Sequence, residues 1–358
     1  MQTQNQIESG AKPELASLES HPDPWLSVVL SRHRSPYWLS HEGPETDVVL
    51  STRVRFMRNL CGFRFPAECE KSQLEEVDNR VSTELLSMGY EKHTLTSSAE
   101  RALLLGSRLV SPEFQWGKPG RSLFLDRDLA TAVMVNEEDH VRTQSVVPGF
   151  DEGSAATRAE GLEAELGSRL PFAWTERHGY LGSSLLQTGR GRRVGVMMHL
   201  PATVTEGRAN TLVATAEAAG LEVRGSYGES TAGLGAFVQL SASGNNSGNL
   251  STHVRHLIDR EQEARQRIRP NTLAEQLEST RSIIGQNNGL TITTAVTCLS
   301  WLRLEACLGA EASARREIDT LLALIGLREG ESQSTGLRRS RLLRRFLGKP
   351  SQAEVPAR

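Results

Sequence analysis

Hydrophobic and polar positions follow two different periods along the chain, and the change between them divides the sequence. Residues 41–269 mix short apolar or alternating runs, typical of strands, with segments of helical spacing. We expect strands at 47–56, 122–125, 130–134, 194–200, 221–229 and 236–240, and helices at 72–86, 99–105, 155–166, 203–219 and 249–269. Beyond Pro270 only helical spacing remains, at 273–284, 291–308 and 311–327. The pattern predicts a polar N-terminal extension and anchor (1–40), a mixed domain (41–269) and a C-terminal helical domain (270–358).

An acidic stretch follows the expected strand at 130–134. Residues 135–142 read V-N-E-E-D-H-V-R, which places three carboxylates and a histidine at the end of an apolar run. Like charges repel, and burying each of them costs free energy unless a partner is present. The stretch therefore predicts a cationic partner nearby. A plain polar turn after a strand is the alternative interpretation.

Arginines stand on several of the expected strands. In an extended chain, residues two apart share a face, so Arg53 and Arg55 project together while Thr52 and Val54 point the other way. A solvated edge strand would show the same spacing. With Arg142, Arg193 and Arg224 on other strand segments, the set suits a nucleotide triphosphate, because so many guanidinium groups repel one another without an anion.

Neither of the two common phosphoryl-transfer architectures is present. The chain has no G-x-x-x-x-G-K-[ST] motif and no H-R-D or D-F-G motif, which leaves a phosphate clamp built from arginines. Glycines at 189 and 191 beside the strand of Arg193 would let backbone amides approach phosphate, although a hairpin turn uses the same residues. The glycine-rich loop at 225–229 presents Glu229, either over a ligand or simply to solvent.

Composition narrows the class of protein. The net charge of the 358 residues is −2, so we expect no nucleic-acid partner. The basic run R-R-S-R-L-L-R-R at 338–345 is either a partner surface or a solvated helix face. Four cysteines without C-x-x-C spacing favour neither a zinc ribbon nor a disulfide framework. No leader-like start or long apolar window is present, which predicts a soluble cytoplasmic protein without a membrane partner.

Five motifs occur in the order found in ATP:guanido phosphotransferases. They are S-T-R-V-R at 51–55, R-N-L at 58–60, N-E-E-D-H-V-R at 136–142, G-R-G-R-R-V-G-V-M-M-H-L-P-A at 189–202 and R-G-S-Y-G-E at 224–229. The chain most resembles the bacterial protein arginine kinases, since it lacks the long helical N-terminal domain of creatine and arginine kinases. The resemblance implies an α+β fold with a mostly antiparallel sheet flanked by helices, followed by a helical C-terminal domain.

The resemblance also implies a reaction and its residues. It implies an ATP-dependent protein arginine kinase that uses Mg²⁺ to transfer the γ-phosphate of ATP to arginine guanidinium groups of proteins. Glu137, Glu138 and Glu229 would hold and activate the acceptor, with Ser184 beside it. The implied nucleotide contacts are Ser51, Thr52, Arg53, Val54, Arg55, Arg108, Arg142, Arg193, Val194, Gly195, Val196, Met197, Arg224, Gly225, Ser226, Tyr227, Gly228 and Glu229. The alternatives are a phosphagen kinase for small guanidino compounds and a weakened, non-catalytic regulator that binds nucleotide or arginine.

The chain departs from the family at three places. Ser184 stands where the family carries a cysteine in a C-P-[ST]-N context, which predicts slower turnover because a hydroxyl stays neutral. Arg108 replaces a nucleotide-contacting histidine. No R-D-x-x-R-A pattern is recognisable at 337–345, which argues against control by phosphoarginine. As partners, the resemblance suggests protein substrates with exposed arginines, a zinc-binding activator protein, the protein quality-control machinery and a second copy in a homodimer.

Overall fold

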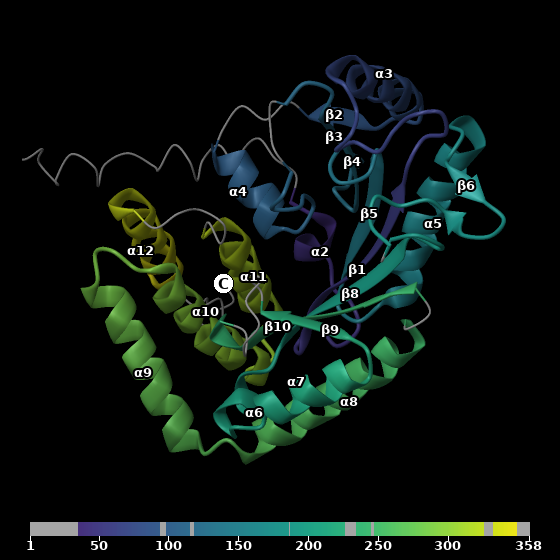
Figure 1. Ribbon diagram of the computed structural model, residues 1–358. Helices are drawn as coiled ribbons and strands as arrows, with labels where there is room; N and C mark the ends of the chain where they lie inside the picture. The colour runs from purple at the N-terminus through teal and green to yellow at the C-terminus, as the bar shows by residue number, and fades with distance from the viewer. Residues whose placement is uncertain are drawn as a thin grey trace, which may run out of the picture.

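A single large sheet forms the centre of the molecule. The computed structural model describes residues 35–93, 98–114, 118–185, 187–225, 234–244, 247–325 and 332–348. Eight strands pair in the order β2-β3-β4-β5-β1-β8-β10-β9 (Figure 1), and every neighbouring pair is antiparallel. The strands are β1 (Val49–Arg58), β2 (Glu91–His93), β3 (Ser122–Leu125), β4 (Thr131–Val135), β5 (Val141–Pro148), β8 (Arg192–His199), β9 (Glu222–Gly225) and β10 (Phe237–Ser243). The expected α+β fold, with helices flanking a mostly antiparallel sheet, is confirmed.

Helices cover both faces of this sheet. Figure 1 shows α3 at the top and α5 at the right, with the C-terminal helices gathered on the left. The helices of the mixed segment are α2 (Tyr37–Ser40), α3 (Lys71–Ser87), α4 (Ser98–Gly106), α5 (Glu152–Arg169), α6 (Pro201–Thr205), α7 (Ala209–Ala218) and α8 (Ser247–Arg267). A two-stranded ribbon, β6 (Trp174–Thr175) with β7 (Gly179–Tyr180), forms a second small sheet. One short 3₁₀ helix, η2 (Leu234–Ala236), precedes β10.

Alternation along the central strand β1 decides which side chains reach which face. Val54 and Phe56 belong to an apolar core shared with α5 and α8. Arg53 and Arg55 line a pocket on the opposite face, as the two-residue period predicted. Pairing on both sides keeps this alternation regular from Ser51 to Phe56, whereas a register shift against β8 interrupts it between Val49 and Ser51.

Two expected helices have different bounds in the structure. The helix expected at 203–219 is two helices, α6 and α7, separated around Gly207, whose φ is +72°. A left-handed residue cannot continue a right-handed helix, and glycine adopts that conformation without steric cost. Pro270 both ends the helical run of α8 and starts the next helix, because its fixed φ suits a first helical position where no N–H partner is needed.

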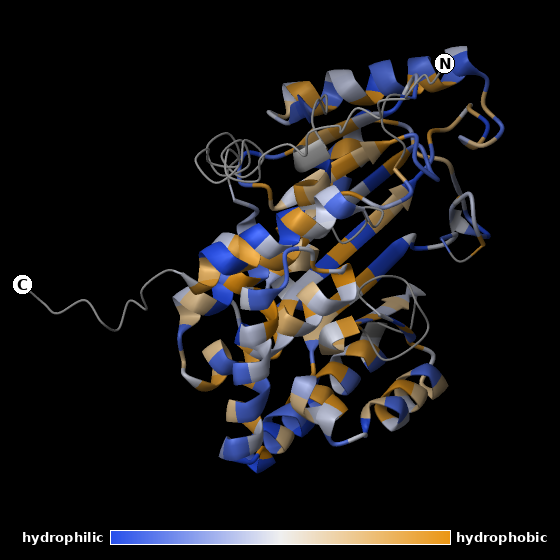
Figure 2. Cartoon of the chain, turned by 90° about the vertical axis from the view of Figure 1, so that its left-hand side faces the viewer, coloured by the Kyte–Doolittle hydropathy of each residue, from blue (hydrophilic) through white to orange (hydrophobic). Residues whose placement is uncertain are grey.

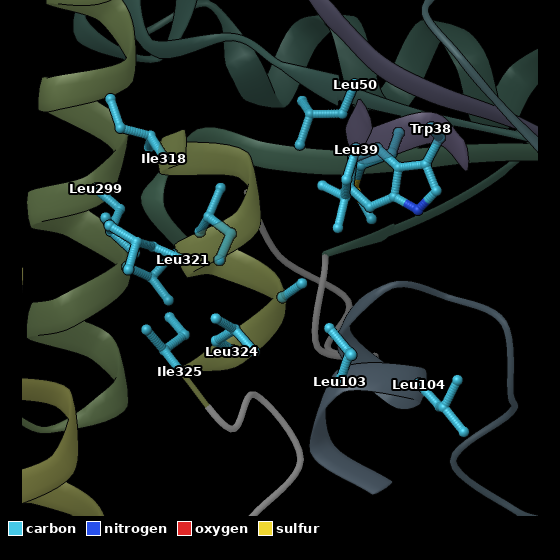
Figure 3. Close-up of a cluster of buried hydrophobic side chains, with 14 of the residues drawn as sticks. Trp38, Leu39, Leu50, Leu103, Leu104, Leu299, Ile318, Leu321, Leu324 and Ile325 are labelled. Atoms are coloured by element: carbon cyan, nitrogen blue, oxygen red, sulfur yellow. The ribbon is translucent and has the colours of Figure 1, made fainter. Parts of the chain in front are cut away.

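The segment after Pro270 consists of helices among its described residues. They are α9 (Pro270–Gln286), α10 (Ile292–Leu308), α11 (Ala312–Leu324) and α12 (Gln333–Leu347). Hydrophilic and hydrophobic residues both occur along these helices (Figure 2), and α10 is buried on more than one side, since Leu302, Arg303 and Leu304 are all buried. Their apolar residues form one cluster with α2, α4 and the sheet: Figure 3 shows Leu299 and Ile318 on one side of it and Trp38, Leu50 and Leu103 on the other. The helical segment and the sheet thus share a core.

The basic run at 338–345 lies on α12, and the idea that it is simply a solvated helix face is wrong for two of its arginines. Arg339 is fully buried and donates hydrogen bonds to the carbonyls of Ile325 and Leu290. Arg344 donates to the carbonyls of Ile284 and Asn287 at the end of α9. Helix ends leave carbonyls without intrahelical partners, and a cation there also complements the helix dipole. These arginines therefore join α12 to its neighbours.

None of the helices among the described residues is long and apolar enough to cross a membrane. All four cysteines are free thiols.

Candidate functional site

Strand register brings arginines of neighbouring strands together on one face of the sheet. Arg55 on β1 lies opposite Arg193 on β8, and Met57, two residues beyond Arg55, lies opposite Arg142 on β5. These three strands are adjacent at the middle of the sheet. The arginines that the sequence placed on separate strands are therefore neighbours in space.

A pocket of about 160 Å³ opens over Arg55 and Arg142. Its charged lining consists of five arginines and one glutamate: Arg53, Arg55, Arg108, Arg142, Arg224 and Glu113. Its apolar lining includes Trp38, Leu50, Leu105, Phe237, Leu322 and Ala323, the last two of which belong to α11. This combination suits a ligand with an anionic part and an apolar part.

The arginines raise one another's electrostatic energy. Burial lowers the pKa of Arg53 well below its usual value, and the charges of Arg55, Arg108, Arg142 and Arg193 lower it further. The guanidinium group nevertheless stays protonated at neutral pH, so the cluster carries an unfavourable repulsion. Among the described residues, the buried Nε atoms of Arg53, Arg142 and Arg193 have no hydrogen-bond acceptor. An anion with several oxygens would supply both charge and acceptors.

Arg108 is held in a strained backbone conformation at the pocket. Its φ is +67°, a left-handed value that few residues other than glycine adopt. Its guanidinium donates to the hydroxyl of Ser51 and, at 3.4 Å, to Oε1 of Gln239, while its carbonyl accepts from Nε2 of Gln144 at 2.9 Å. Burial lowers the pKa of Arg108 to about 10. Strain of this kind persists where the surroundings fix a residue for function.

Glu222 on β9 neutralises part of the cluster, although the sequence analysis did not select it. Its carboxylate accepts from Nη2 of Arg193 and, at 3.1 Å, from Nη2 of Arg224. Arg193 also donates to the hydroxyl of Ser241 at 2.8 Å. The only indication in the sequence is that Glu222 and Arg224 are two residues apart on one strand and therefore share a face.

The acidic stretch forms a tight connection between β4 and β5. Asn136 begins it with φ +54°, and its side-chain amide donates to the carbonyls of Leu74 and Gly120. Glu137 is buried, whereas the side chain of Glu138 is exposed. The two neighbouring glutamates thus lie in different environments.

Glu137 meets its cationic partner within the chain. Its carboxylate accepts from Nη1 of Arg142 at 2.8 and 2.6 Å and from the hydroxyl of Ser111. Burial would raise the pKa of Glu137, but Arg142 and these hydrogen bonds outweigh it and hold the pKa below its usual value. Glu137 therefore connects the acidic stretch to the arginine cluster, and it is ionised at neutral pH.

Asp139 and His140 stabilise the connection. His140 is fully buried, its Nδ1 accepts from the backbone N–H of Leu60 at 3.1 Å, and burial lowers its pKa to about 4 despite an opposing hydrogen bond to the backbone of Arg64. A neutral imidazole can accept at Nδ1, so the lowered pKa and the hydrogen bond agree. Asp139 accepts from the N–H of Ser183 at 2.7 Å.

The loop that carries Ser184 lies against Glu138. Nε2 of Gln187 donates to the Glu138 carboxylate at 2.8 Å, and the hydroxyl of Ser183 donates to the Glu138 carbonyl at 2.8 Å. Leu185 is 93% exposed at the tip. The structure therefore brings Glu138, Gln187 and the backbone of Ser184 into one small region.

Some of the expected nucleotide contacts point away from the pocket. The hydroxyl of Thr52 donates to the carbonyl of Gly149, and Val54, Val194 and Val196 belong to the apolar core on the other face. These four residues could contact a ligand in the pocket only through their backbone atoms. Met197, by contrast, lines it, and so does Arg224, while Gly225 ends β9 beside it. Ser226, Tyr227, Gly228 and Glu229 lie outside the described residues.

A larger cavity of about 960 Å³ lies on the opposite face of the sheet, beside α5 and the β6–β7 ribbon. Five of its charged side chains form ion pairs with each other: Arg58, Arg192, Glu152, Glu160 and Glu163. Arg58 contacts Glu163 at 2.6 Å, and Arg192 contacts Glu152 at 3.1 Å. Because these charges are balanced locally, size alone does not make this cavity the reaction site.

Comparisons with known proteins agree with this geometry. Residues 69–264 match the family profile described as "ATP:guanido phosphotransferase, C-terminal catalytic domain". The chain is 32% identical over 300 residues to the protein-arginine kinase of Geobacillus stearothermophilus, which covers 78% of this chain and 82% of that protein. It is 30% identical over 314 residues to the protein-arginine kinase of Moorella thermoacetica. That alignment covers 82% of this chain and 89% of the relative. The chain belongs to the ATP:guanido phosphotransferase family.

Solved structures show the same fold at greater sequence distance. Lombricine kinase superposes with a TM-score of 0.51 and 21% identity, over 64% of this chain and 71% of that one. The duplicated taurocyamine kinase from Schistosoma mansoni was solved with components of a transition-state analogue. It superposes with a TM-score of 0.53 and 22% sequence identity, over 82% of this chain and 49% of that one.

Proposed function

We propose that this protein is an ATP-dependent protein arginine kinase, which transfers the γ-phosphate of ATP to arginine side chains of other proteins. The observation that carries the proposal is the pocket that Arg53, Arg55 and Arg142 line together with apolar side chains. The curated relatives are protein-arginine kinases that match most of this chain, which supports protein arginine as the acceptor.

The arginine cluster binds and orients the triphosphate. Guanidinium groups donate in a fixed planar fork that matches phosphate oxygens, and here they are positioned by paired strands before any ligand arrives. Most of the acceleration in phosphoryl transfer comes from positioning and from neutralising charge, and this chain supplies both through Arg53, Arg55, Arg142, Arg193 and Arg224.

The acceptor arginine is a poor nucleophile until a carboxylate takes its proton, because its pKa lies above 12. We assign this role to Glu138, whose exposed carboxylate is held by Gln187. Glu137 lies between this region and Arg142 and orients the acceptor relative to the phosphates. Glu229 is proposed as a second carboxylate on the acceptor by family resemblance.

Mg²⁺ is expected to arrive with the nucleotide. No group of three or more potential metal-ligating side chains occurs among the described residues. A magnesium ion that accompanies a nucleotide is usually held by phosphate oxygens, water and one or two carboxylates. The ion would neutralise charge on the β- and γ-phosphates.

Incubation of the protein with ATP, Mg²⁺ and an arginine-rich protein is expected to yield acid-labile phosphate on arginine. Arg55→Gln should abolish the product by weakening the phosphate clamp, and it serves as the control for contaminating kinases. A folded protein that binds ATP but phosphorylates no arginine would refute the activity. If phosphate instead passes only to free arginine or creatine, the protein is a phosphagen kinase for small guanidino compounds.

Ser184→Cys is expected to raise kcat about tenfold, a barrier change of about 1.4 kcal/mol. A thiolate next to the acceptor guanidinium adds negative charge that a hydroxyl cannot supply. Steady-state kinetics with the same protein substrate measure the effect, and Ser184→Ala controls for loss of the hydroxyl. Equal rates for the cysteine variant and the unmodified protein would remove the basis for a weakened site, and with it the case for a purely regulatory protein.

Further partners rest on family resemblance. We propose a cytoplasmic protein that acts with a zinc-binding activator and the protein quality-control machinery, and that pairs with a second copy of itself. Co-purification with candidate partners and measurement of molar mass in solution test these assignments.

A further inference from the structure

One buried side chain, Asn59, joins two segments that meet at the acceptor site. The first is the acidic connection that carries Glu138, and the second is the loop that carries Ser184. They are far apart in sequence, and neither is part of a strand of the large sheet. Their relative position therefore depends on side-chain contacts.

Asn59 lies directly after β1 and is only 2% exposed. Its Nδ2 donates to Oδ1 of Asp139 at 2.6 Å and to the carbonyl of Leu181 at 3.0 Å. Its Oδ1 accepts from the backbone N–H of His140 at 2.9 Å. Both ends of the amide are thus in use, with two hydrogen bonds to the acidic connection and one to the loop.

The contacts continue beyond Asn59. The same Oδ1 atom of Asp139 accepts from the N–H of Ser183 at 2.7 Å, and the Ser183 hydroxyl donates to the carbonyl of Glu138. The loop side chain Gln187 then reaches the Glu138 carboxylate. A series of hydrogen bonds therefore runs from the end of the central strand to the Glu138 carbonyl, and the same loop supplies a separate hydrogen bond to the Glu138 carboxylate.

We propose that Asn59 is a positioning residue for phosphoryl transfer, which sets the distance between the Glu138 carboxylate and the Ser184 loop. This inference rests on the proposed function, because it assigns Glu138 and the loop to the acceptor. Asn59 itself does not touch the reacting atoms. A displacement of about 1 Å at a reacting group can cost about a hundredfold in rate, so a buried anchor of this kind has a large effect on kcat.

The amide group is required, and not merely a side chain of this size. An aspartate at position 59 would have the same shape and could still accept from His140. It could not donate to Asp139 and Leu181, and it would place a second carboxylate within 3 Å or so of the first, where like charges repel. Asn59→Asp should therefore disturb the site at least as much as Asn59→Ala.

The test compares Asn59→Ala, Asn59→Asp and a control, Tyr90→Phe, which removes a partly buried hydrogen bond to Thr131, at the end of β4 away from the acidic connection. Both Asn59 variants should lower kcat for the protein substrate by about 10- to 100-fold with the Kd for ATP unchanged. The control should retain full activity. A loss of ATP affinity in parallel with kcat, or a change in kcat under twofold, would overturn the proposal.

Hydrogen exchange gives a second readout that does not depend on activity. The amide of Ser183 bonds to Asp139 and not to Asn59, so its exchange reports whether Asn59 holds Asp139 in place. We expect faster exchange at Ser183 in both Asn59 variants and unchanged exchange in Tyr90→Phe. Protection equal to that of the control would refute the positioning role. If the unmodified protein transfers no phosphate, the proposed function fails, and the exchange rates still decide this inference.

Discussion

Glu138→Gln is expected to lower kcat by about 100- to 10,000-fold while ATP binding is retained, because a general base typically contributes an acceleration of that size. Glutamine keeps the shape of the side chain and its contact with Gln187, but it cannot take a proton from the acceptor guanidinium. Glu138 is also exposed and lies outside the arginine cluster, so the phosphate clamp should be unaffected.

Steady-state kinetics measure kcat, and nucleotide titration measures the Kd for ATP. The matched control is Glu278→Gln, an exposed glutamate on α9 far from the pocket, which should have no effect. Glu137→Gln is an instructive contrast. Its carboxylate binds Arg142, so this variant should change ATP affinity as well as rate. Retention of more than a tenth of kcat by Glu138→Gln would contradict its role as the base.

Arg303→Met is expected to destabilise the protein by about 3–5 kcal/mol, the usual cost of removing one partner of a buried ion pair. Arg303 is fully buried on α10 and donates to the carboxylate of Asp319 at 2.7 Å. It also donates to the carbonyls of Thr46 and Asp47, just before β1, and contacts Nδ1 of His199 on β8. One guanidinium thus joins the helical segment to the sheet.

Denaturant unfolding monitored by circular dichroism measures the change in the free energy of unfolding. Arg281→Met is the control, because Arg281 forms a largely exposed ion pair with Glu305 at 2.6 Å and should cost no more than about 1 kcal/mol. The double variant Arg303→Met with Asp319→Leu should recover part of the loss, since no unpaired buried charge remains. Equal destabilisation by Arg303→Met and Arg281→Met would show that the buried network does not connect the two parts.

Local periodicity predicted the parts of the site that depend on strands. The two-residue period placed Arg53 and Arg55 on one face, and the structure shows them lining one pocket. The same period predicted that Val54 points to the other face of the sheet, where it lies in the apolar core shared with α5 and α8. Regular strands repeat their geometry, so face assignments within a strand can be made from sequence.

Contacts between distant segments could not be predicted in the same way. The sequence predicted a cation for the acidic stretch, but it did not predict that Asp139 would bind Asn59, which lies 80 residues away. Such pairs depend on how loops approach each other in three dimensions. The buried Arg339 illustrates the same limit, because its carbonyl partners lie in other segments of the chain.

Helix α11 has a consequence for any attempt to divide the chain at Pro270. Leu322 and Ala323 form part of the apolar wall of the proposed nucleotide pocket, and Gly106 of α4 packs so closely that a Cβ there would lie 2.0 Å from the Ala323 carbonyl. A chain truncated before α9 would lose this wall and expose the apolar residues behind it. The proposed nucleotide pocket is therefore lined by residues from both sides of Pro270.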